Sequence, residues 1–249
     1  MRKFILTVRP EPDGALDVAT LARRNVPALS APLMAPSYHA SEFSASGYKF
    51  SGVILTSRHA VTGLCAATGS RLDDGIAGLP TFAVGRATAR AAREAGFRNV
   101  TIGHGGGAGL VPLITEVAPR LDGPLLWPAA LHRGFDMVAA LDSIADVVNW
   151  PVYEMRETEI LPDDAVAAIA GGDVLGVVLM SARSARLFRE RLLALGQDRA
   201  VASMGLIAGS DAIVAASGDG WAETFVSKRP ARARLLAIAS LLYDRRTRS

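Results

Sequence analysis

Short apolar runs alternate with amphipathic segments along the whole chain, which predicts alternating strands and helices. The expected strands are Phe4–Val8, Ala28–Met34, Gly52–Thr56, Thr81–Val84, Asn99–Ile102, Leu125–Trp127, Val147–Val152, Val174–Met180 and Met204–Ala208. The expected helices are Gly14–Arg23, Ser57–Ala66, Arg86–Ala95, Gly109–Pro119, Arg133–Ser143, Asp163–Ala170, Ser184–Leu195 and Pro230–Tyr243. This alternation is typical of parallel sheets with helices on both faces.

The same pattern occurs twice in the chain. After a shift of 124 positions Gly52–Leu55 matches Gly176–Leu179, and Ser57 then matches Ser181. Further matches at this shift are Gly85 with Gly209, Gly96 with Gly220 and Phe97 with Trp221. Near the N-terminus the shift is about 120, and Gly14, Val18 and Leu21 match Gly134, Val138 and Leu141. Each copy has about 120 residues, a length that suits one doubly wound α/β unit.

Composition and charge narrow the class of protein. Half of the residues are apolar and a fifth are charged, a balance typical of a globular protein. The single cysteine, Cys65, excludes an internal disulfide and a cysteine metal cluster. The apolar run near the N-terminus is too short for a signal peptide, and no stretch is long enough to span a bilayer. We therefore expect a cytoplasmic protein without membrane partners.

The positive charge is concentrated at the C-terminus. Seven basic residues fall within the last 22 positions, where Asp244 is the one acidic residue. They are Lys228, Arg229, Arg232, Arg234, Arg245, Arg246 and Arg248. No aromatic-rich recognition element accompanies them, so we expect a solvated basic face and no nucleic-acid partner.

Two equivalent turns join a buried strand to a helix. Thr56, Ser57 and Arg58 follow the strand Gly52–Leu55, and Ser181 has the corresponding place in the second copy. In open parallel sheets ligands bind at such turns, where backbone N–H groups of the helix N-terminus attract carboxylate or phosphate. The alternative is that both serines only cap their helices.

A second strand-to-helix turn contains Gly85, Arg86 and Thr88. A glycine at such a turn allows the backbone to approach a ligand closely. Gly209 and Ser210 stand at the matching turn of the second copy, where alanine replaces the threonine. The alternative is a tight turn in which the threonine hydroxyl bonds back to its own helix.

The loop Gly103–Gly109 superficially fits a dinucleotide-binding fingerprint. The next strand, Leu125–Trp127, lacks the acidic residue that would hold a ribose hydroxyl, so a flexible loop at a ligand cleft is the better interpretation. The four histidines lack metal-ligand spacing, and Cys65 fits a helix core better than a nucleophile.

Several of these segments together resemble the uroporphyrinogen-III synthase family. The resemblance rests on the order and spacing of loose motifs over nearly the whole chain. They are Thr7–Pro10, Ile54–Val61, Ala83–Ala89, Ala95–Phe97, Pro151–Glu154, Leu179–Ala185 and Lys228–Pro230. The resemblance implies an α/β fold of two similar doubly wound, flavodoxin-like parallel-sheet lobes with crossed connections and a cleft between them. Residues 1–34 with 158–249 would form lobe one and residues 37–150 lobe two, joined by linkers 35–36 and 151–157.

The resemblance also implies a function. The substrate would be hydroxymethylbilane, a linear tetrapyrrole with carboxylates on every ring, which loses its terminal hydroxyl as water and closes with inversion of the last pyrrole. The enzyme would be a lyase without metal or organic cofactor, with a transient contact to the deaminase upstream of it. Tyr153, on the strand motif Pro151–Glu154, is the expected catalytic residue. The expected substrate-binding residues are Thr56, Ser57, Arg58, Gly85, Arg86, Thr88, Ser181, Gly209 and Ser210.

Two other classes of function stay open at this stage. A non-catalytic two-lobed protein that binds a small molecule would have the same repeat, and a nucleotide-dependent oxidoreductase would use the glycine loop. Met180 and Ala212 stand where threonines would match the first copy, so we do not expect equal hydroxyl chemistry in the two lobes.

Overall fold

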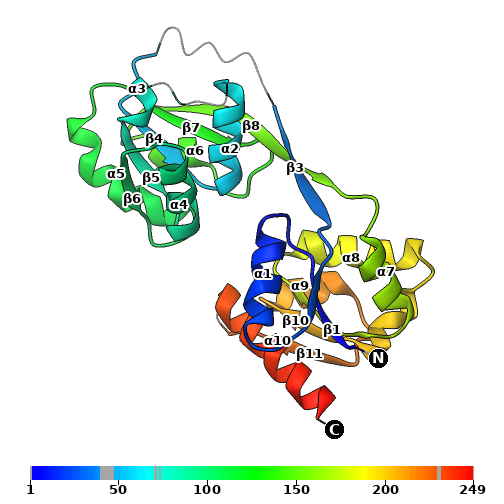
Figure 1. Cartoon of the computed structure of the whole chain (residues 1–249). Coiled ribbons are helices and arrows are strands. Elements are labelled where there is room, and N and C mark those ends of the chain that lie inside the picture. The colour runs from blue at the N-terminus through cyan, green and yellow to red at the C-terminus, as the bar shows by residue number, and fades with distance from the viewer. Residues whose placement is uncertain (1, 40–47, 70–71, 73, 229–230, 249) are drawn as a thin grey trace. The chain divides into compact units, whose positions relative to one another are not determined.

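The computed structural model describes residues 2–39, 48–69, 72, 74–228 and 231–248. The chain forms two compact units (Figure 1). The first unit is Met1–Ala35 together with Arg156–Ser249, and the second is Pro36–Met155. Residues 35–36 and 151–157, expected as linkers, lie within the strands β3 (Met34–Tyr38) and β8 (Val147–Glu157).

The first unit has one five-stranded parallel sheet in the order β2-β1-β9-β10-β11. The strands are β1 (Phe4–Thr7), β2 (Ala28–Ser30), β9 (Val174–Leu179), β10 (Gly205–Ala208) and β11 (Glu223–Val226). The helices are α1 (Asp13–Ala22), α7 (Asp163–Ala170), α8 (Ala182–Ala194), α9 (Asp211–Ser217) and α10 (Arg232–Thr247), with a 3-10 turn at Asp198–Ser203. Counted along the unit, this is the flavodoxin-like strand order 2-1-3-4-5.

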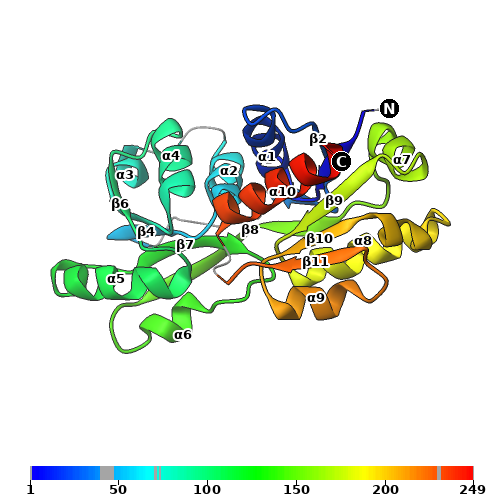
Figure 2. The same ribbon diagram turned by 90° about the horizontal axis from the view of Figure 1, so that it is seen from below.

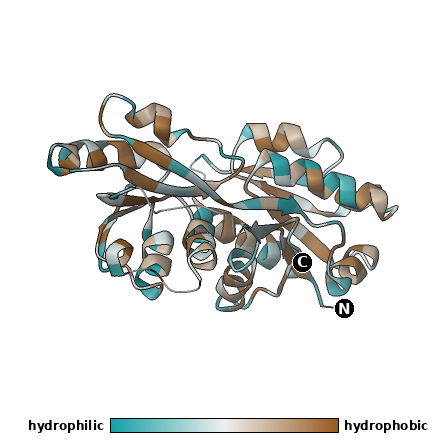
Figure 3. Cartoon of the chain, turned by 90° about the horizontal axis from the view of Figure 1, so that it is seen from above, coloured by the Kyte–Doolittle hydropathy of each residue, from teal (hydrophilic) through white to brown (hydrophobic). Residues whose placement is uncertain are grey.

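The two faces of this sheet carry separate hydrophobic clusters, because neighbouring side chains on a strand point to opposite faces. Leu6 packs with α7, α8 and α9, whereas its neighbour Ile5 packs with α1 and α10. In Figure 2, α1 and α10 accordingly lie on one side of the sheet and α8 and α9 on the other. The helices of both units carry apolar and polar stretches, as expected for helices with one buried side (Figure 3).

The second unit has a six-stranded sheet in the order β3-β8-β7-β4-β5-β6. Its further strands are β4 (Gly52–Leu55), β5 (Pro80–Ala83), β6 (Asn99–Ile102) and β7 (Leu125–Ala130). Its helices are α2 (Arg58–Ala67), α3 (Asp74–Ala77), α4 (Arg86–Glu94), α5 (Val111–Val117) and α6 (Met137–Leu141), with 3-10 turns at Gly107–Leu110 and Ala118–Arg120. α2 and α4 pack on one face of the sheet, and α5 and α6 pack on the other.

The repeat in the sequence corresponds to a repeat in the sheets. Strands β8-β7-β4-β5-β6 of the second unit stand in the same spatial order as β2-β1-β9-β10-β11 of the first. The predicted α/β class, with two mostly parallel sheets and interleaved helices, is confirmed.

Several predicted boundaries are wrong. The run Ala28–Met34 is two strands, β2 and β3, interrupted at Pro32, whose backbone nitrogen carries no hydrogen for a sheet bond. β7 continues through Pro128 to Ala130, and β8 continues to Glu157. Helix α6 begins after Asp136, whose carboxylate accepts hydrogen bonds from Val138 N and Ala139 N. The predicted helix start at Arg133 is therefore part of a loop. α3, α9 and β11 were not predicted.

The expectation of a solvated basic C-terminus is also wrong for Arg232 and Arg246, which are partly buried, whereas Arg245 is ion-paired but 57% exposed. Arg245 and Arg246 both pair with Glu223, and Arg232 pairs with the buried Asp17. Arg229 lies outside the described residues. No helix in the described part of the chain has the length and apolar character needed to cross a membrane.

Candidate functional site

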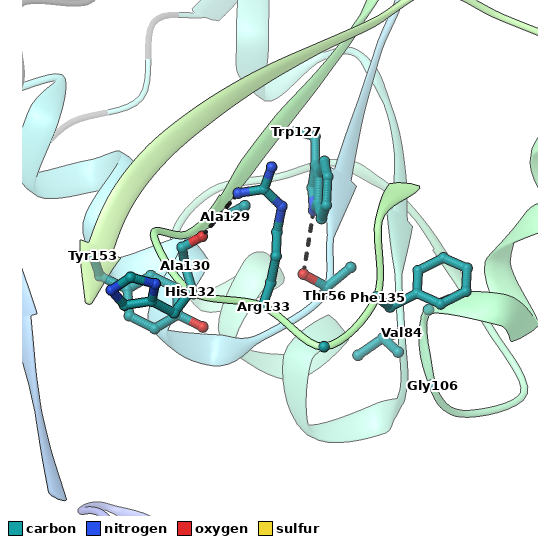
Figure 4. Close-up of a pocket in the computed structure, with 12 residues that line it drawn as sticks. Thr56, Val84, Gly106, Trp127, Ala129, Ala130, His132, Arg133, Phe135 and Tyr153 are labelled. Carbon is teal, nitrogen blue, oxygen red and sulfur yellow. Dashed lines mark hydrogen bonds between the residues drawn. The ribbon is translucent and has the colours of Figure 1, made fainter. Parts of the chain in front are cut away.

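A cavity of about 270 Å³ lies in the second unit where strands β4 and β7 end (Figure 4). The chain runs from β4 outward to β6 and then returns to β7 on the other side of β4, so the strand order reverses between these two strands. Ligands of open α/β sheets bind at this kind of reversal. The cavity is lined by Thr56, Val84, Gly106, Gly107, Trp127, Ala129, Ala130, His132, Arg133, Gly134, Phe135 and Tyr153. Its volume is near the lower end of the range for ligand pockets, about 300–1,000 Å³.

Trp127 organises the central part of this cavity. Its side chain is 1% exposed, and its indole N–H donates a hydrogen bond to Thr56 Oγ1 at 3.3 Å. The guanidinium carbon of Arg133 lies 4.9 Å from the centroid of the tryptophan ring, within the range of a cation–π contact (Figure 4). Nη1 of Arg133 also lies 3.5 Å from the carbonyl oxygens of Ala130 and Leu131, at the limit of a hydrogen bond. No carboxylate of the described residues pairs with Arg133.

Tyr153 lines the same cavity and belongs to a cluster of polar aromatic side chains. It is 7% exposed, and the Ser57 hydroxyl is close enough to influence its pKa. Its ring centroid lies 5.6 Å from that of His59 and 6.5 Å from that of Tyr38. The Tyr38 hydroxyl and His59 Nδ1 are 3.0 Å apart. Four side chains from β3, β8 and the start of α2 thus meet beside the cavity.

Burial fixes the protonation of this cluster near neutral pH. It raises the pKa of Tyr153, although the hydrogen bond with Ser57 acts in the opposite direction. Burial also raises the pKa of Tyr38, against the effect of a hydrogen bond with Thr62. The pKa of His59 is lowered by burial and by the charge of Arg58. At pH 7 both phenols are therefore protonated and the imidazole is neutral.

The structure brings some of the predicted residues together. Thr56 and Tyr153 line the cavity. Ser57 is the N-cap of α2 and accepts a hydrogen bond from His59 N at 3.0 Å, so the capping alternative is correct for Ser57. The Ser57 hydroxyl also acts to lower the pKa of Tyr153, against the effect of burial. Arg58 is the first residue of α2.

The second predicted turn lies at the start of α4. Gly85 is the N-cap of this helix, with an extended backbone and no atom within 4 Å of the position that a Cβ would take. Arg86 is exposed and Thr88 is buried, and neither lines the cavity. The cavity includes Val84, directly before Gly85.

The remaining predicted residues lie in the first unit. Ser181 is the N-cap of α8, where its Oγ accepts a hydrogen bond from Ser184 N at 3.1 Å. Gly209 is buried directly after β10. Ser210 precedes α9 and makes no capping bond with its side chain.

Three cavity side chains that carry hydrogen-bonding groups do not appear among the predicted residues: Trp127, His132 and Arg133. The strand was expected to end at Trp127 and the next helix to begin at Arg133, which left His132 without a role. A useful signal was Gly134 followed by Asp136, since glycine favours a turn and aspartate is a preferred N-cap residue, which together place the helix start after a loop. Among the residues that the structure describes, no group of three or more His, Cys, Asp or Glu side chains could hold a metal ion.

The sequence family described as uroporphyrinogen-III synthase HemD matches residues 18–237 of the chain. The chain belongs to the uroporphyrinogen-III synthase family. This assignment confirms the function that the sequence motifs predicted and implies a tetrapyrrole as the small-molecule substrate. It favours neither the non-catalytic binding protein nor the oxidoreductase. No curated protein sequence matches the chain.

Solved structures of uroporphyrinogen III synthases have a similar fold. The enzyme from Helicobacter pylori 26695 matches with a TM-score of 0.60 and 15% identity, over 97% of this chain and 100% of that one. A mutant of the enzyme from the extremely thermophilic bacterium Thermus thermophilus matches with a TM-score of 0.52 and 17% identity, over 98% of this chain and 99% of that one. At such identities the likeness supports the fold of this uroporphyrinogen-III synthase family member, and its site has to be argued from its own residues.

Proposed function

We propose that the chain is a cofactor-independent lyase that closes hydroxymethylbilane to uroporphyrinogen III, with Tyr153 assisting the loss of the terminal hydroxyl. One observation supports this assignment most directly. A buried, protonated tyrosine lies in a cavity at the strand-order reversal, beside the hydroxyl of Thr56 and the guanidinium of Arg133. A group that donates hydrogen bonds and groups that attract carboxylates thus share one cavity.

The first chemical step is heterolysis of the C–O bond of the terminal hydroxymethyl group. The oxygen leaves as water after it receives a proton, and the electron pair of the attached pyrrole nitrogen stabilises the carbon that is left. Tyr153 delivers that proton or orders the water that delivers it. The cationic carbon then bonds to the substituted α-carbon of the last pyrrole, which gives a spirocyclic intermediate. The bond between that α-carbon and its original methylene breaks, and the methylene bonds to the free α-carbon of the same ring, which is thereby inverted. That carbon loses its hydrogen as a proton, which balances the proton that left with the water.

The hydrogen bonds around Tyr153 favour the role of a donor. Ser57 accepts a hydrogen bond from His59 N, so its own hydroxyl hydrogen is available for Tyr153. The phenol then keeps its own hydrogen for the substrate. Because burial raises the pKa of Tyr153, the phenol carries this hydrogen throughout the neutral range. General acid assistance of this kind is worth about 10²–10⁴-fold in rate.

The other predicted donors would hold the carboxylates of the substrate. In the second unit these are Thr56, Ser57, Arg58, Gly85, Arg86 and Thr88, and in the first unit Ser181, Gly209 and Ser210. Their contribution is through hydroxyls, charges and the backbone N–H groups of helix N-termini. A transient contact with the upstream deaminase, which would supply the unstable substrate, stays a prediction.

The test is an incubation with hydroxymethylbilane, which closes spontaneously to the type I isomer. We expect the protein to direct the product to the type III isomer, measured by chromatography of the oxidised porphyrins. A product that stays entirely type I at high protein concentration would contradict the proposal. If hydroxymethylbilane bound tightly and only type I formed, the non-catalytic binding protein would be the correct class.

A further inference from the structure

Arg133 is the one arginine among the described residues that line the cavity, and it is not among the predicted substrate-binding residues. Arg133 lies on the loop between β7 and α6, and its guanidinium is held over Trp127. Its contacts with protein oxygens are two carbonyls at 3.5 Å, both through Nη1. Nε and Nη2 have no hydrogen-bond partner among the described residues. Arg133 is exposed, and its guanidinium is oriented by the Trp127 ring while most of its hydrogen-bonding capacity is unused.

Thr56 is held by the same tryptophan. The indole N–H donates to Thr56 Oγ1, so the hydroxyl already has a donor and its own hydrogen can be given to a ligand. Trp127 thus holds two donors on one side of the cavity, a neutral hydroxyl and a guanidinium (Figure 4). Since Trp127 is buried, its own position is set by the core of the second unit.

We propose that Arg133 and Thr56, both positioned by Trp127, form the binding site for one carboxylate of the tetrapyrrole substrate. This assignment rests on the proposed function and deepens it, because it names the group that the cavity recognises. Guanidinium matches a carboxylate with two parallel N–H donors, and such charge-assisted bonds are stronger than neutral ones. Tyr153 lines the same cavity, so an anchored carboxylate would fix the ring that carries it relative to the phenol.

The first experiment compares Arg133→Gln with Arg120→Gln. Arg120 is an exposed arginine of the same unit that does not line the cavity, so its variant controls for loss of a positive charge. With hydroxymethylbilane as substrate, we expect Arg133→Gln to raise KM by about 10- to 100-fold and to change kcat by less than about threefold. Arg120→Gln should stay within twofold of the wild type. Arg133→Lys should lie between the two, because lysine keeps the charge but loses the fork of donors.

The second experiment measures equilibrium binding of uroporphyrin, the stable oxidised product, which carries the same acidic side chains as the substrate. Its Kd should rise in Arg133→Gln by a factor similar to that of KM. This readout does not depend on turnover. Circular dichroism and thermal unfolding show whether each variant is folded, and Arg133→Lys replaces Arg133→Gln should the latter be unfolded.

Double variants test whether the two donors act on one carboxylate. Thr56→Val removes the hydroxyl and keeps the shape, and its effect on KM should combine less than multiplicatively with that of Arg133→Gln. Trp127→Phe keeps an aromatic ring under Arg133 and loses the N–H, so it should add little to Thr56→Val. If Trp127 had a purely structural role, Trp127→Phe would instead raise KM by the same factor in the wild type and in Thr56→Val.

The outcomes separate this inference from the proposed function. If the wild type makes no type III product, the proposed function is wrong. If the wild type makes type III product and Arg133→Gln has the same KM and uroporphyrin affinity as Arg120→Gln, only the carboxylate site is wrong. Fully multiplicative effects of Thr56→Val and Arg133→Gln would overturn the shared site.

Discussion

The two units differ at the point where the strand order reverses. The second unit has a cavity between the ends of β4 and β7. The first unit has an ion-paired carboxylate beside the end of β1, the strand equivalent to β7. Asp17 of α1 is 0% exposed and accepts a hydrogen bond from Thr7 Oγ1 at 3.1 Å. Arg9 pairs with it at 3.3 Å, and Arg232 pairs with it as well. These two arginines are therefore already paired with a carboxylate of the protein.

The second unit has the opposite arrangement at matching positions. Thr7 corresponds to Trp127 and Asp17 corresponds to Met137 at the shift of 120 positions. Met137 is fully buried in the apolar core. Since methionine has no carboxylate, this position offers no partner to Arg133. At the same shift Arg9 corresponds to Ala129 and Arg133 corresponds to Asp13, so the cations also stand at different positions. The same scaffold therefore carries an internal ion pair in the first unit, whereas in the second unit we propose a site for an acidic ligand.

The largest effect is expected for Asp17→Asn, which removes the internal carboxylate. Among the residues that the structure describes, its loss leaves Arg232 without a carboxylate partner and Arg9 with Asp13 alone. Breaking a buried ion pair costs about 3–5 kcal/mol. The two arginine side chains are 22% and 37% exposed, so we expect the lower end, about 3 kcal/mol. Urea denaturation followed by circular dichroism measures the change in the free energy of unfolding.

Asp13→Asn is the matched control for this prediction. Asp13 also pairs with Arg9, but its side chain is 25% exposed, so the loss should be clearly smaller. Similar stabilities of both variants and the wild type would show that the carboxylate of the first unit does not hold it together. The contrast between the ion pairs of Asp17 in the first unit and the cavity beside Arg133 in the second would then have no energetic basis.

The next largest effect is expected for Tyr153→Phe, which removes the proposed general acid from the cavity of the second unit. We expect kcat to fall by about 100-fold or more, since the phenyl ring keeps its packing and only the proton donor is lost. Tyr243→Phe, on α10 of the first unit, is the control and should be fully active. Turnover is measured as type III product per unit time, with thermal unfolding as a check of the fold.

A rate of Tyr153→Phe equal to that of the wild type would remove Tyr153 from the mechanism. A rate that falls only in proportion to folded protein would show a structural role. After either result, the proposed carboxylate site of Arg133 and Thr56 would be the feature that still distinguishes the second unit from the first.

Much of the fold was predictable because the repeat is local and strong. The strand β6 occupies Asn99–Ile102, and the same shift of 124 positions places its copy at Glu223–Val226, the range that β11 occupies. We nevertheless missed β11, because half of its side chains are exposed and its hydrophobic pattern is weak. A repeat is thus a better guide to an edge strand than its own composition.

The site was less predictable because it depends on contacts between distant residues. Thr56 could be placed at a strand end and Tyr153 on a strand motif from the sequence, but the contact between the rings of His59 and Tyr153 joins residues almost a hundred positions apart. The contact between Arg133 and Trp127 was hidden for another reason. Val138 and Leu141 gave the segment a helical pattern, and the cap at Asp136, which leaves Arg133 in a loop, was not recognised.

A smaller effect is expected for Gly85→Val, at the turn that precedes α4 in the second unit. The extended backbone accepts any residue, and a Cβ here would have no neighbour within 4 Å, so the fold should lose about 1 kcal/mol or less. We expect activity to fall by about tenfold because the side chain would hinder approach of the substrate to the turn. Ser57→Ala is the contrasting variant, since it removes a helix cap and should cost about 1 kcal/mol of stability. Wild-type activity of Gly85→Val would show that the substrate does not reach this turn.

The smallest effect is expected in the pH dependence of the stability of the second unit, through His59. The pKa of His59 is lowered by burial and by Arg58, so the unfolded chain binds a proton at this residue more readily than the folded one. The stability of the second unit should therefore be complete above about pH 7, fall as the pH drops below the ordinary histidine pKa of about 6.5, and level off below the lowered value. His59→Asn should remove this part of the pH dependence, measured as urea denaturation between pH 5 and 8. Parallel stability curves for His59→Asn and the wild type would mean that the imidazole beside Tyr38 and Tyr153 is protonated as easily in the folded unit as in water. The neutral state of the cluster, and with it the role of Tyr153 as a hydrogen-bond donor among neutral groups, would then have to be abandoned.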